Sequence, residues 1–234
     1  NVSLQRIFST ILGNFLSKFP QEINKKTDAI IEGSIVIYNT IRAELLPTPT
    51  KSHYTFNLRD LAKIFQGMLM IDSKKINSKE LVARLWIHEV RRVFADRFTN
   101  LDDHAWLKAL LIEEVEQKFG LIYDEVFPNN FLLYGDFINS DIEPANRLYE
   151  EMPYMSKLKH VVEEYLVDHN SESKQPMPLV MFSDAVEHVG AGGIAEGCAG
   201  QITEIHAENE QPLEALGVSR FLAEDAIGIR PVAF

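Results

Sequence analysis

The chain has 234 residues, 46% of them hydrophobic and 24% charged, which is ordinary for a globular protein that buries a core. Its formal net charge is -11 and its isoelectric point is near 5.1, so the composition argues against nucleic-acid binding and against attraction to an anionic membrane surface. Because Cys198 is the only cysteine, an intrachain disulfide and a cysteine-based metal cluster are both excluded.

Helices are expected throughout the first half of the chain. Apolar residues between positions 4 and 16 recur at the spacing of one helical face, which predicts a helix that ends before Pro20. Pro47 and Pro49 remove two amide donors and restrict the residues before them, which predicts a short, stiff connector. The remaining helices are expected at about 21–46, 57–70, 77–97 and 101–119.

The second half combines turns, helices and a divergent end. Residues 120–145 contain turn sequences, while helices are expected at about 153–169 and 178–189 with a polar loop at 170–178. No firm structure is expected over residues 190–234, which are rich in small and then in acidic residues. The fold class is therefore mainly α. The sequence opens with Asn1 and shows neither a secretory signal nor a membrane-spanning run, so a cytosolic piece of a larger protein is expected.

The connector leads into the most informative stretch, His53-Tyr54-Thr55-Phe56-Asn57-Leu58-Arg59-Asp60-Leu61. Asn57 is a favourable N-cap, and Asp60 can reach back to the cap amide as in a capping box. Arg59 then stands in the first helical turn, where a cation opposes the helix dipole and an anion such as phosphate would offset that cost. From spacing alone, an ion pair with Asp60 or a solvated side chain is the more common arrangement, because arginines often occur in a first helical turn.

Several consecutive segments carry a resemblance to a known family. The run from Leu45 to Leu61 resembles the start of the AAA+ lid in the third motor module of dynein heavy chains, and the resemblance is of the axonemal type. Other segments on both sides of this run are also similar to the family, and they occur in the family's order between residues 2 and 189. They are Ser3–Leu12, Leu85–Arg97, Tyr134–Phe137 and Leu179–His188.

The resemblance implies a helical AAA+ lid subdomain flanked by partial pieces of two large subdomains. Residues 1–46 would be the last helices of one large subdomain, and residues 47–140 would be the lid. Residues 141–189 would form a linker and the start of the fourth module. Residues 190–234 resemble no recognised dynein sequence, so this tail is expected to be divergent and disordered, or to be wrongly joined to the rest.

The resemblance also implies a function. Arg59 matches the family's sensor 2 arginine, which faces the nucleotide, and Leu179, Val180 and Phe182 would help to wall the adenine pocket of the next module. The complete motor would be an ATP-driven, minus-end-directed microtubule motor that binds ATP or ADP with magnesium. No cofactor and no hydrolysis are expected of this chain alone, because the P-loop and the Walker B strand lie outside the resemblance.

Partners and location follow from the same resemblance. The expected partners are neighbouring AAA+ modules of one heavy chain, with microtubules and dynein light and intermediate chains bound through other regions. Neither nucleic acid nor membrane is expected as a partner. The location would be the cytoplasm, the cytoskeleton and the ciliary axoneme. The alternative is a free-standing helical protein-interaction module, and an unrelated helical enzyme is disfavoured because no complete catalytic set appears.

Other polar residues have simpler interpretations. His88-Glu89 lacks the second histidine of a zinc-protease motif, because Arg92 stands there, so a position at a helix surface or interface is expected. Asp103 is expected to supply first-turn charge to a helix rather than a metal site. Glu114, beside Glu113, is expected on a solvated face, and no metal ligand set is predicted. The paired Glu163 and Glu164 are expected to be solvated as well, whereas Trp86 and Phe94 fall at core spacing.

Overall fold

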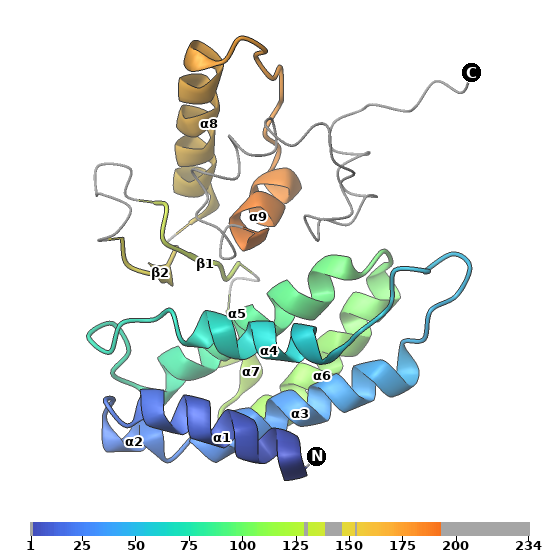
Figure 1. Ribbon diagram of the computed structural model, residues 1–234, viewed down its shortest axis with the longest axis vertical. Helices are drawn as coiled ribbons and strands as arrows, with labels where there is room; N and C mark the ends of the chain where they lie inside the picture. Colours follow the sequence, from blue (N-terminus) through green and yellow to red (C-terminus); the bar gives the residue numbers. More distant parts are fainter. Residues whose placement is uncertain (1, 129–130, 139–146, 153, 193–234) are drawn as a thin grey trace. The chain divides into compact units, whose positions relative to one another are not determined.

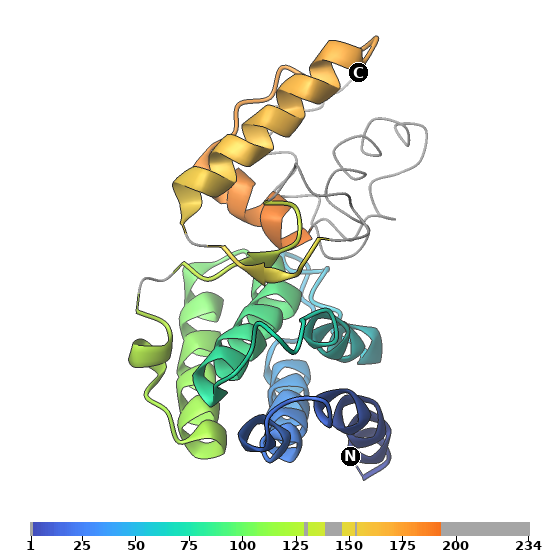
Figure 2. The same ribbon diagram turned by 90° about the vertical axis from the view of Figure 1, so that its left-hand side faces the viewer.

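The computed structural model describes residues 2–128, 131–138, 147–152 and 154–192, and these are mostly helical, as predicted (Figures 1 and 2). The chain divides into two compact units, Asn1–Leu132 and Leu133–Phe234, and each is described by itself. None of the described helices combines the length and the apolar character that crossing a lipid bilayer requires. The domain limits expected at residues 46, 140 and 189 stay a prediction.

The described part of the first unit is built from helices. In chain order these are α1 (Val2–Leu16), α2 (Gln21–Asn24), α3 (Thr27–Glu44), α4 (Leu58–Met68), α5 (Lys79–Phe94), the 3-10 helix η1 (Ala95–Arg97), α6 (Leu101–Phe119) and α7 (Tyr123–Val126). The prediction of a single helix over 21–46 is wrong, because a turn at Lys25 and Lys26 separates α2 from α3. The Thr27 hydroxyl donates to the Asn24 carbonyl at 2.8 Å across that turn.

Trp86 of α5 lies at the centre of the core, as the spacing predicted. It is fully buried, its ring packs on Phe119 of α6 with centroids 5.4 Å apart, and its indole N–H donates to the Ser34 hydroxyl of α3 at 2.8 Å. A Cβ at Gly33 would come within 3.0 Å of the Trp86 ring, so the missing side chain allows α3 to approach. Phe94 is also fully buried.

Two expectations about polar residues are wrong. His88 and Glu89 were expected at a helix surface or interface, yet they are 2% and 0% exposed, because α5 is covered on several sides. Glu114 was expected on a solvated face and is 5% exposed, because α6 turns this side toward α3. Its neighbour Glu113 hydrogen bonds at the surface to Gln117.

The described part of the second unit consists of a short antiparallel ladder and two helices. β1 (Tyr134–Gly135) pairs with β2 (Glu150–Glu151), with Tyr134 opposite Glu151. The helix expected at 153–169 is α8 (Met155–Glu172), which is longer than predicted and shortens the polar loop. The helix expected to begin at residue 178 is α9 (Ser183–Gly192). Of the tail expected to be unstructured over 190–234, residues 190–192 belong to α9 and the rest lie outside the described residues.

Residues 177–182 are not helical, and the Asn170 side chain binds the backbone of Met177 at the start of this segment. The Asn170 carboxamide accepts from the Met177 N–H at 2.7 Å and donates to the Met177 carbonyl at 3.0 Å. These two bonds satisfy the backbone groups of Met177 outside any helix, so α9 begins only after the segment.

Candidate functional site

The first turn of α4 carries the predicted capping box. The Asn57 side-chain oxygen accepts from the Arg59 N–H at 2.8 Å, and the Asp60 carboxylate accepts from the Asn57 N–H at 2.9 Å. Such a box satisfies two amide donors that the helix leaves unpaired and typically stabilises a helix by about 1 kcal/mol. The backbone of Arg59 is therefore fixed, whatever its side chain does.

The Arg59 side chain is exposed at the start of α4. Among the residues that the structure describes, it makes no ion pair and no hydrogen bond. The alternative of an Arg59–Asp60 ion pair does not occur, because Asp60 pairs with Arg97 instead. The structure thus leaves Arg59 in solvent, where it can reach a ligand.

Asp60 and Arg97 form a two-point ion pair behind the capping box. The Arg97 Nη2 and Nη1 atoms lie 2.5 Å from Asp60 Oδ1 and 3.2 Å from Asp60 Oδ2. The side chains are 3% and 22% exposed, so water screens the pair only partly. Arg97 belongs to η1 and also lies over the Phe56 ring, 5.8 Å from its centroid.

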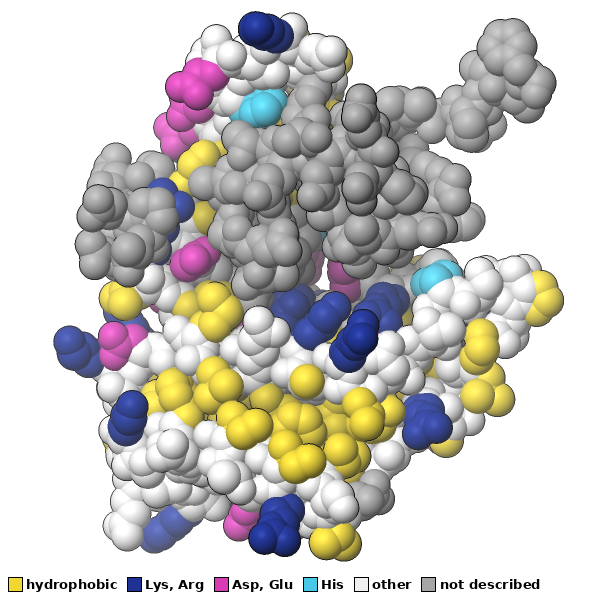
Figure 3. All heavy atoms as spheres, viewed as in Figure 1, with side chains coloured by type: hydrophobic (Ala, Val, Ile, Leu, Met, Phe, Trp, Pro, Cys, Tyr) yellow, Lys and Arg dark blue, Asp and Glu magenta, His cyan; other side chains and the backbone are white. Residues whose placement is uncertain are grey.

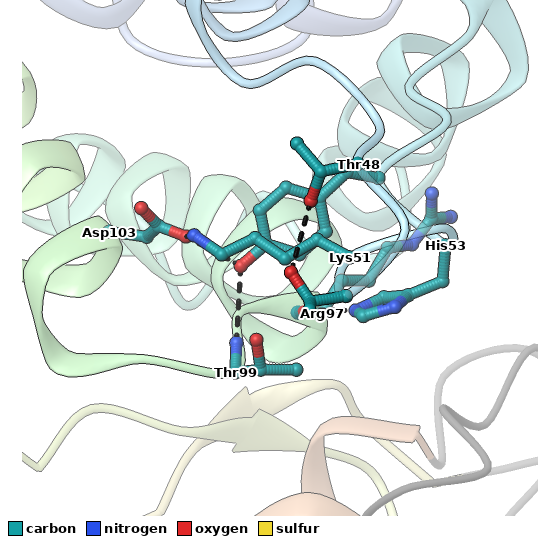
Figure 4. A network of polar contacts seen from close by, with 8 residues as sticks. Thr48, Lys51, His53, Arg97, Thr99 and Asp103 are labelled. Atoms are coloured by element: carbon teal, nitrogen blue, oxygen red, sulfur yellow. Dashed lines mark hydrogen bonds and ion pairs between the residues drawn. The ribbon is translucent and has the colours of Figure 1, made fainter.

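A second polar network holds the connector that precedes α4 (Figure 4). Lys51 Nζ and the Tyr54 hydroxyl both donate to Asp103 Oδ2 at 2.6 Å, and the Thr99 N–H donates to the Tyr54 oxygen at 3.2 Å. Burial opposes ionisation of Asp103, but the bonds from Lys51 and Tyr54 hold the pKa of this carboxyl below its usual value. Asp103 does lie in the first turn of α6, as expected, and it also anchors the connector.

The last turns of α4 are held by a third carboxylate. Arg92 donates to Glu89 Oε2 through Nε at 3.0 Å and through Nη2 at 2.8 Å, and Glu89 is fully buried. A Cβ at Gly67 of α4 would lie 2.0 Å from Glu89 Oε2, so glycine makes room for this carboxylate. The Glu89–Arg92 pair therefore fixes the packing of α4 on α5.

His88 and its neighbours do not form a metal centre. Burial lowers the pKa of His88 to about 3, so its ring is neutral near pH 7, and Nδ1 lies 3.3 Å from the Leu132 carbonyl. Within the described part of the chain, no three His, Cys, Asp or Glu side chains gather as metal ligands.

Cations gather on one face of the first unit, where Figure 3 shows several Lys and Arg side chains together. Lys63 follows Arg59 by one turn of α4 and is also exposed. Arg92 reaches the Lys63 carbonyl with Nη2 at 3.3 Å. Arg92 and Arg97 have carboxylate partners, whereas the described residues offer none to Arg59 or Lys63. The uncompensated positive charge therefore lies along the first turns of α4.

The predicted adenine-pocket residues lie in the second unit, in the extended segment before α9. Val180 and Phe182 are 82% and 43% exposed, and Leu179 is half-buried. Met181 lies between Val180 and Phe182 and is buried. This alternation is that of an extended strand, and it presents Val180 and Phe182 together on the exposed side.

Comparisons with known proteins agree with the resemblance. Residues 30–128 match the AAA+ lid domain family. The chain is 43% identical over 188 residues to human dynein axonemal heavy chain 6, and 43% identical over 202 residues to human dynein axonemal heavy chain 1. Each match covers 80% of this chain but only 4% or 5% of the relative. Human dynein axonemal heavy chain 2 is 37% identical over 186 residues, or 79% of this chain and 4% of the relative.

Proposed function

Because this chain carries an AAA+ lid domain and is a homologue of one segment of the axonemal dynein heavy chains, we propose that it senses nucleotide within an AAA+ ring. In this proposal Arg59 is the sensor 2 residue of the third module. Its guanidinium would contact a phosphate of ATP or ADP, and the lid would pass the nucleotide state to neighbouring modules. The magnesium and most phosphate contacts would come from other parts of the motor.

The single observation that carries the proposal is the contrast between a fixed backbone and a free side chain at Arg59. The capping box holds the backbone, yet the guanidinium has no carboxylate partner among the described residues. A cation in the first turn opposes the helix dipole by roughly 0.3–1 kcal/mol, and an arriving phosphate would remove that cost. A lid that moves as a rigid body can convert such a contact into a change of ring geometry.

An exposed apolar area on the first unit supports contact with another part of the same ring (Figure 3). Ile7 and Ile11 lie one turn apart on α1 and are 53% and 46% exposed, and Leu58 at the start of α4 is 50% exposed. An adjacent AAA+ module would cover such a surface. A free-standing interaction module would use it as well, but its binding would not depend on nucleotide.

The wider assignment is part of the proposal. The chain spans about one twentieth of the length of the relatives that it matches. We propose that the parent protein is an ATP-driven, minus-end-directed microtubule motor of the ciliary axoneme. Microtubules and the light and intermediate chains would bind regions outside this segment. Leu179, Val180 and Phe182 would supply an apolar wall to the nucleotide site of the fourth module.

The test is Arg59→Ala in a heavy chain that contains this segment and whose other nucleotide sites are inactivated at their P-loop lysines. A charge-assisted phosphate contact is commonly worth about 1.5–3 kcal/mol, so the affinity for fluorescent ADP should fall roughly tenfold to hundredfold. Arg59→Lys should recover part of the loss, because lysine keeps the charge but lacks the planar pair of donors.

Arg42→Ala is the matched control, since Arg42 is an exposed arginine in the last turn of α3. It should leave the affinity within about twofold of the parent, as expected of a surface change remote from the site. Equal losses for Arg42→Ala and Arg59→Ala would mean general damage to the lid. Unchanged affinity in Arg59→Ala would refute the sensor assignment.

A further inference from the structure

We propose that Asp60 and Arg97 are positioning residues for Arg59, an inference that rests on the proposed nucleotide contact of Arg59. The Asp60–Arg97 ion pair would hold the first turn of α4 in the orientation from which the guanidinium reaches phosphate. Neither Asp60 nor Arg97 would touch the nucleotide itself.

Both oxygens of the Asp60 carboxylate are engaged, which is the first support for the inference. Oδ1 accepts from Arg97 Nη2 at 2.5 Å, while Oδ2 accepts from the Asn57 N–H at 2.9 Å and from Arg97 Nη1 at 3.2 Å. The capping bond and the ion pair therefore depend on one orientation of one side chain. Bidentate arginine–carboxylate pairs restrict geometry as well as adding energy. Because Asp60 directly follows Arg59, fixing Asp60 fixes the turn that carries Arg59.

Arg97 is itself held from two further directions. The His53 Nε2 atom lies 2.9 Å from the Arg97 carbonyl, and the Arg97 guanidinium lies over the Phe56 ring. His53 and Phe56 belong to the connector before α4, whereas Arg97 follows α5 without a break. Arg97 therefore joins the end of α5 to both the connector and the first turn of α4. A small displacement of η1 would be carried directly to Arg59.

The ion pair also decides which partner Arg59 can have. Arg97 donates to both Asp60 oxygens and the Asn57 N–H donates to one of them, so three of the roughly four acceptor positions of this carboxylate are already taken. An Arg59–Asp60 pair would compete with phosphate for the same guanidinium donors. Arg97 thus positions Arg59 in two ways, through the helix backbone and by keeping Asp60 occupied.

The experiment is a double-mutant cycle between residues 59 and 97, with fluorescent ADP affinity measured in the same heavy chain used for Arg59→Ala. Arg97→Ala should weaken binding about tenfold when Arg59 is present and less than about twofold when Arg59 is already alanine. Arg97→Lys should lie between parent and Arg97→Ala, because one ammonium cannot reproduce two parallel bonds. The non-additivity is the informative readout, since a purely structural loss would be the same in both backgrounds.

Arg92→Ala is the control, because it breaks an arginine–carboxylate pair within α5 whose carboxylate lies against Gly67, near the other end of α4. Its effect on affinity should be independent of residue 59. If Arg97→Ala costs the same factor with and without Arg59, or costs nothing, the positioning role is wrong while the sensor assignment stands. If Arg59→Ala alone leaves binding unchanged, the proposed function fails instead.

Discussion

The two ends of α4 are held by the same kind of ion pair in different surroundings. At the first turn, Asp60 pairs with Arg97, whose side chain remains 22% exposed. Near the last turn, Glu89 pairs with Arg92 inside the protein and lies against Gly67. Arg59 lies at the first turn, where the described residues offer it no carboxylate. The comparison indicates that the charged pair near the last turn of α4 stabilises helix packing, whereas the charged residues at the first turn are also accessible to a ligand.

The buried pair should give the largest loss of stability. Arg92→Ala would remove the Arg92 guanidinium from the buried Glu89 carboxylate, and breaking a buried ion pair typically costs about 3–5 kcal/mol. The measurement is urea unfolding of the 234-residue chain followed by circular dichroism. The double variant Glu89→Met with Arg92→Met should recover most of the loss, because it removes both charges. A loss below about 1 kcal/mol for Arg92→Ala would place this pair in the same class as an ordinary surface pair.

Gly67→Ala tests the packing of the last turns of α4 without removing a charge. The added methyl would overlap the Glu89 carboxylate, so a net loss of about 1–3 kcal/mol in the free energy of unfolding is expected. Gly13→Ala on α1 is the control, since a Cβ there meets nothing within 4 Å and alanine favours a helix by roughly 0.5–1 kcal/mol. Stabilisation by both substitutions would show that the last turns of α4 can move away from Glu89.

Glu114 extends the comparison, because it is a buried carboxyl to which the described residues offer no arginine. Its Oε2 atom has no hydrogen-bond partner among the described residues, and burial raises the pKa of this carboxyl above the ordinary 4.5. A raised pKa means that the folded chain loses stability as pH rises from the unfolded-state pKa toward the folded-state pKa. Glu114→Gln should remove that loss and make the chain more stable than the parent near neutral pH.

Asp103 should show the opposite dependence of folding stability on pH. Its pKa is lowered by Lys51 and Tyr54 against the effect of burial, so its stabilisation is present above the unfolded-state pKa and disappears as pH falls through the folded-state pKa. Urea unfolding of parent, Glu114→Gln and Asp103→Asn from about pH 2 to about pH 8, a range that includes values below the ordinary Asp pKa of roughly 3.9, separates the two effects. A Glu114→Gln chain whose stability follows the parent at every pH would contradict the role given to burial.

The parts of the site that are local in sequence could be predicted from it. The capping box of Asn57 and Asp60 depends on residues three apart, and the apolar spacing around Trp86 and Phe94 predicted their burial. The mainly helical fold followed from the same periodicity. The break between α2 and α3 was missed, because Lys25 and Lys26 are compatible with a helix and their turn depends on tertiary contacts such as Lys26 Nζ with the Lys118 carbonyl.

The long-range ion pairs could not be predicted, because their partners are brought together only by the packed helices. Asp60 and Arg97 are 37 residues apart, and Lys51 and Asp103 are 52 apart. His88 and Glu89 were expected at a helix surface or interface, whereas the packing around α5 buries them inside the unit. One available signal was Gly67, since a glycine inside a helical pattern often marks a close approach by another element.

The central proposal is that Arg59 contacts nucleotide while the capping box and the Asp60–Arg97 ion pair hold the first turn of α4. Hydrogen exchange tests the nucleotide contact and the stability of that turn in one experiment. The measurement is deuterium uptake by the peptide covering residues 53–61 in the full heavy chain, with and without ADP. In the parent, ADP should slow uptake at this peptide. In Arg59→Ala, uptake without ADP should match the parent, because the bonds of Asn57 and Asp60 remain, and ADP should no longer change it. Faster uptake without ADP, or an undiminished response to ADP, would contradict the account.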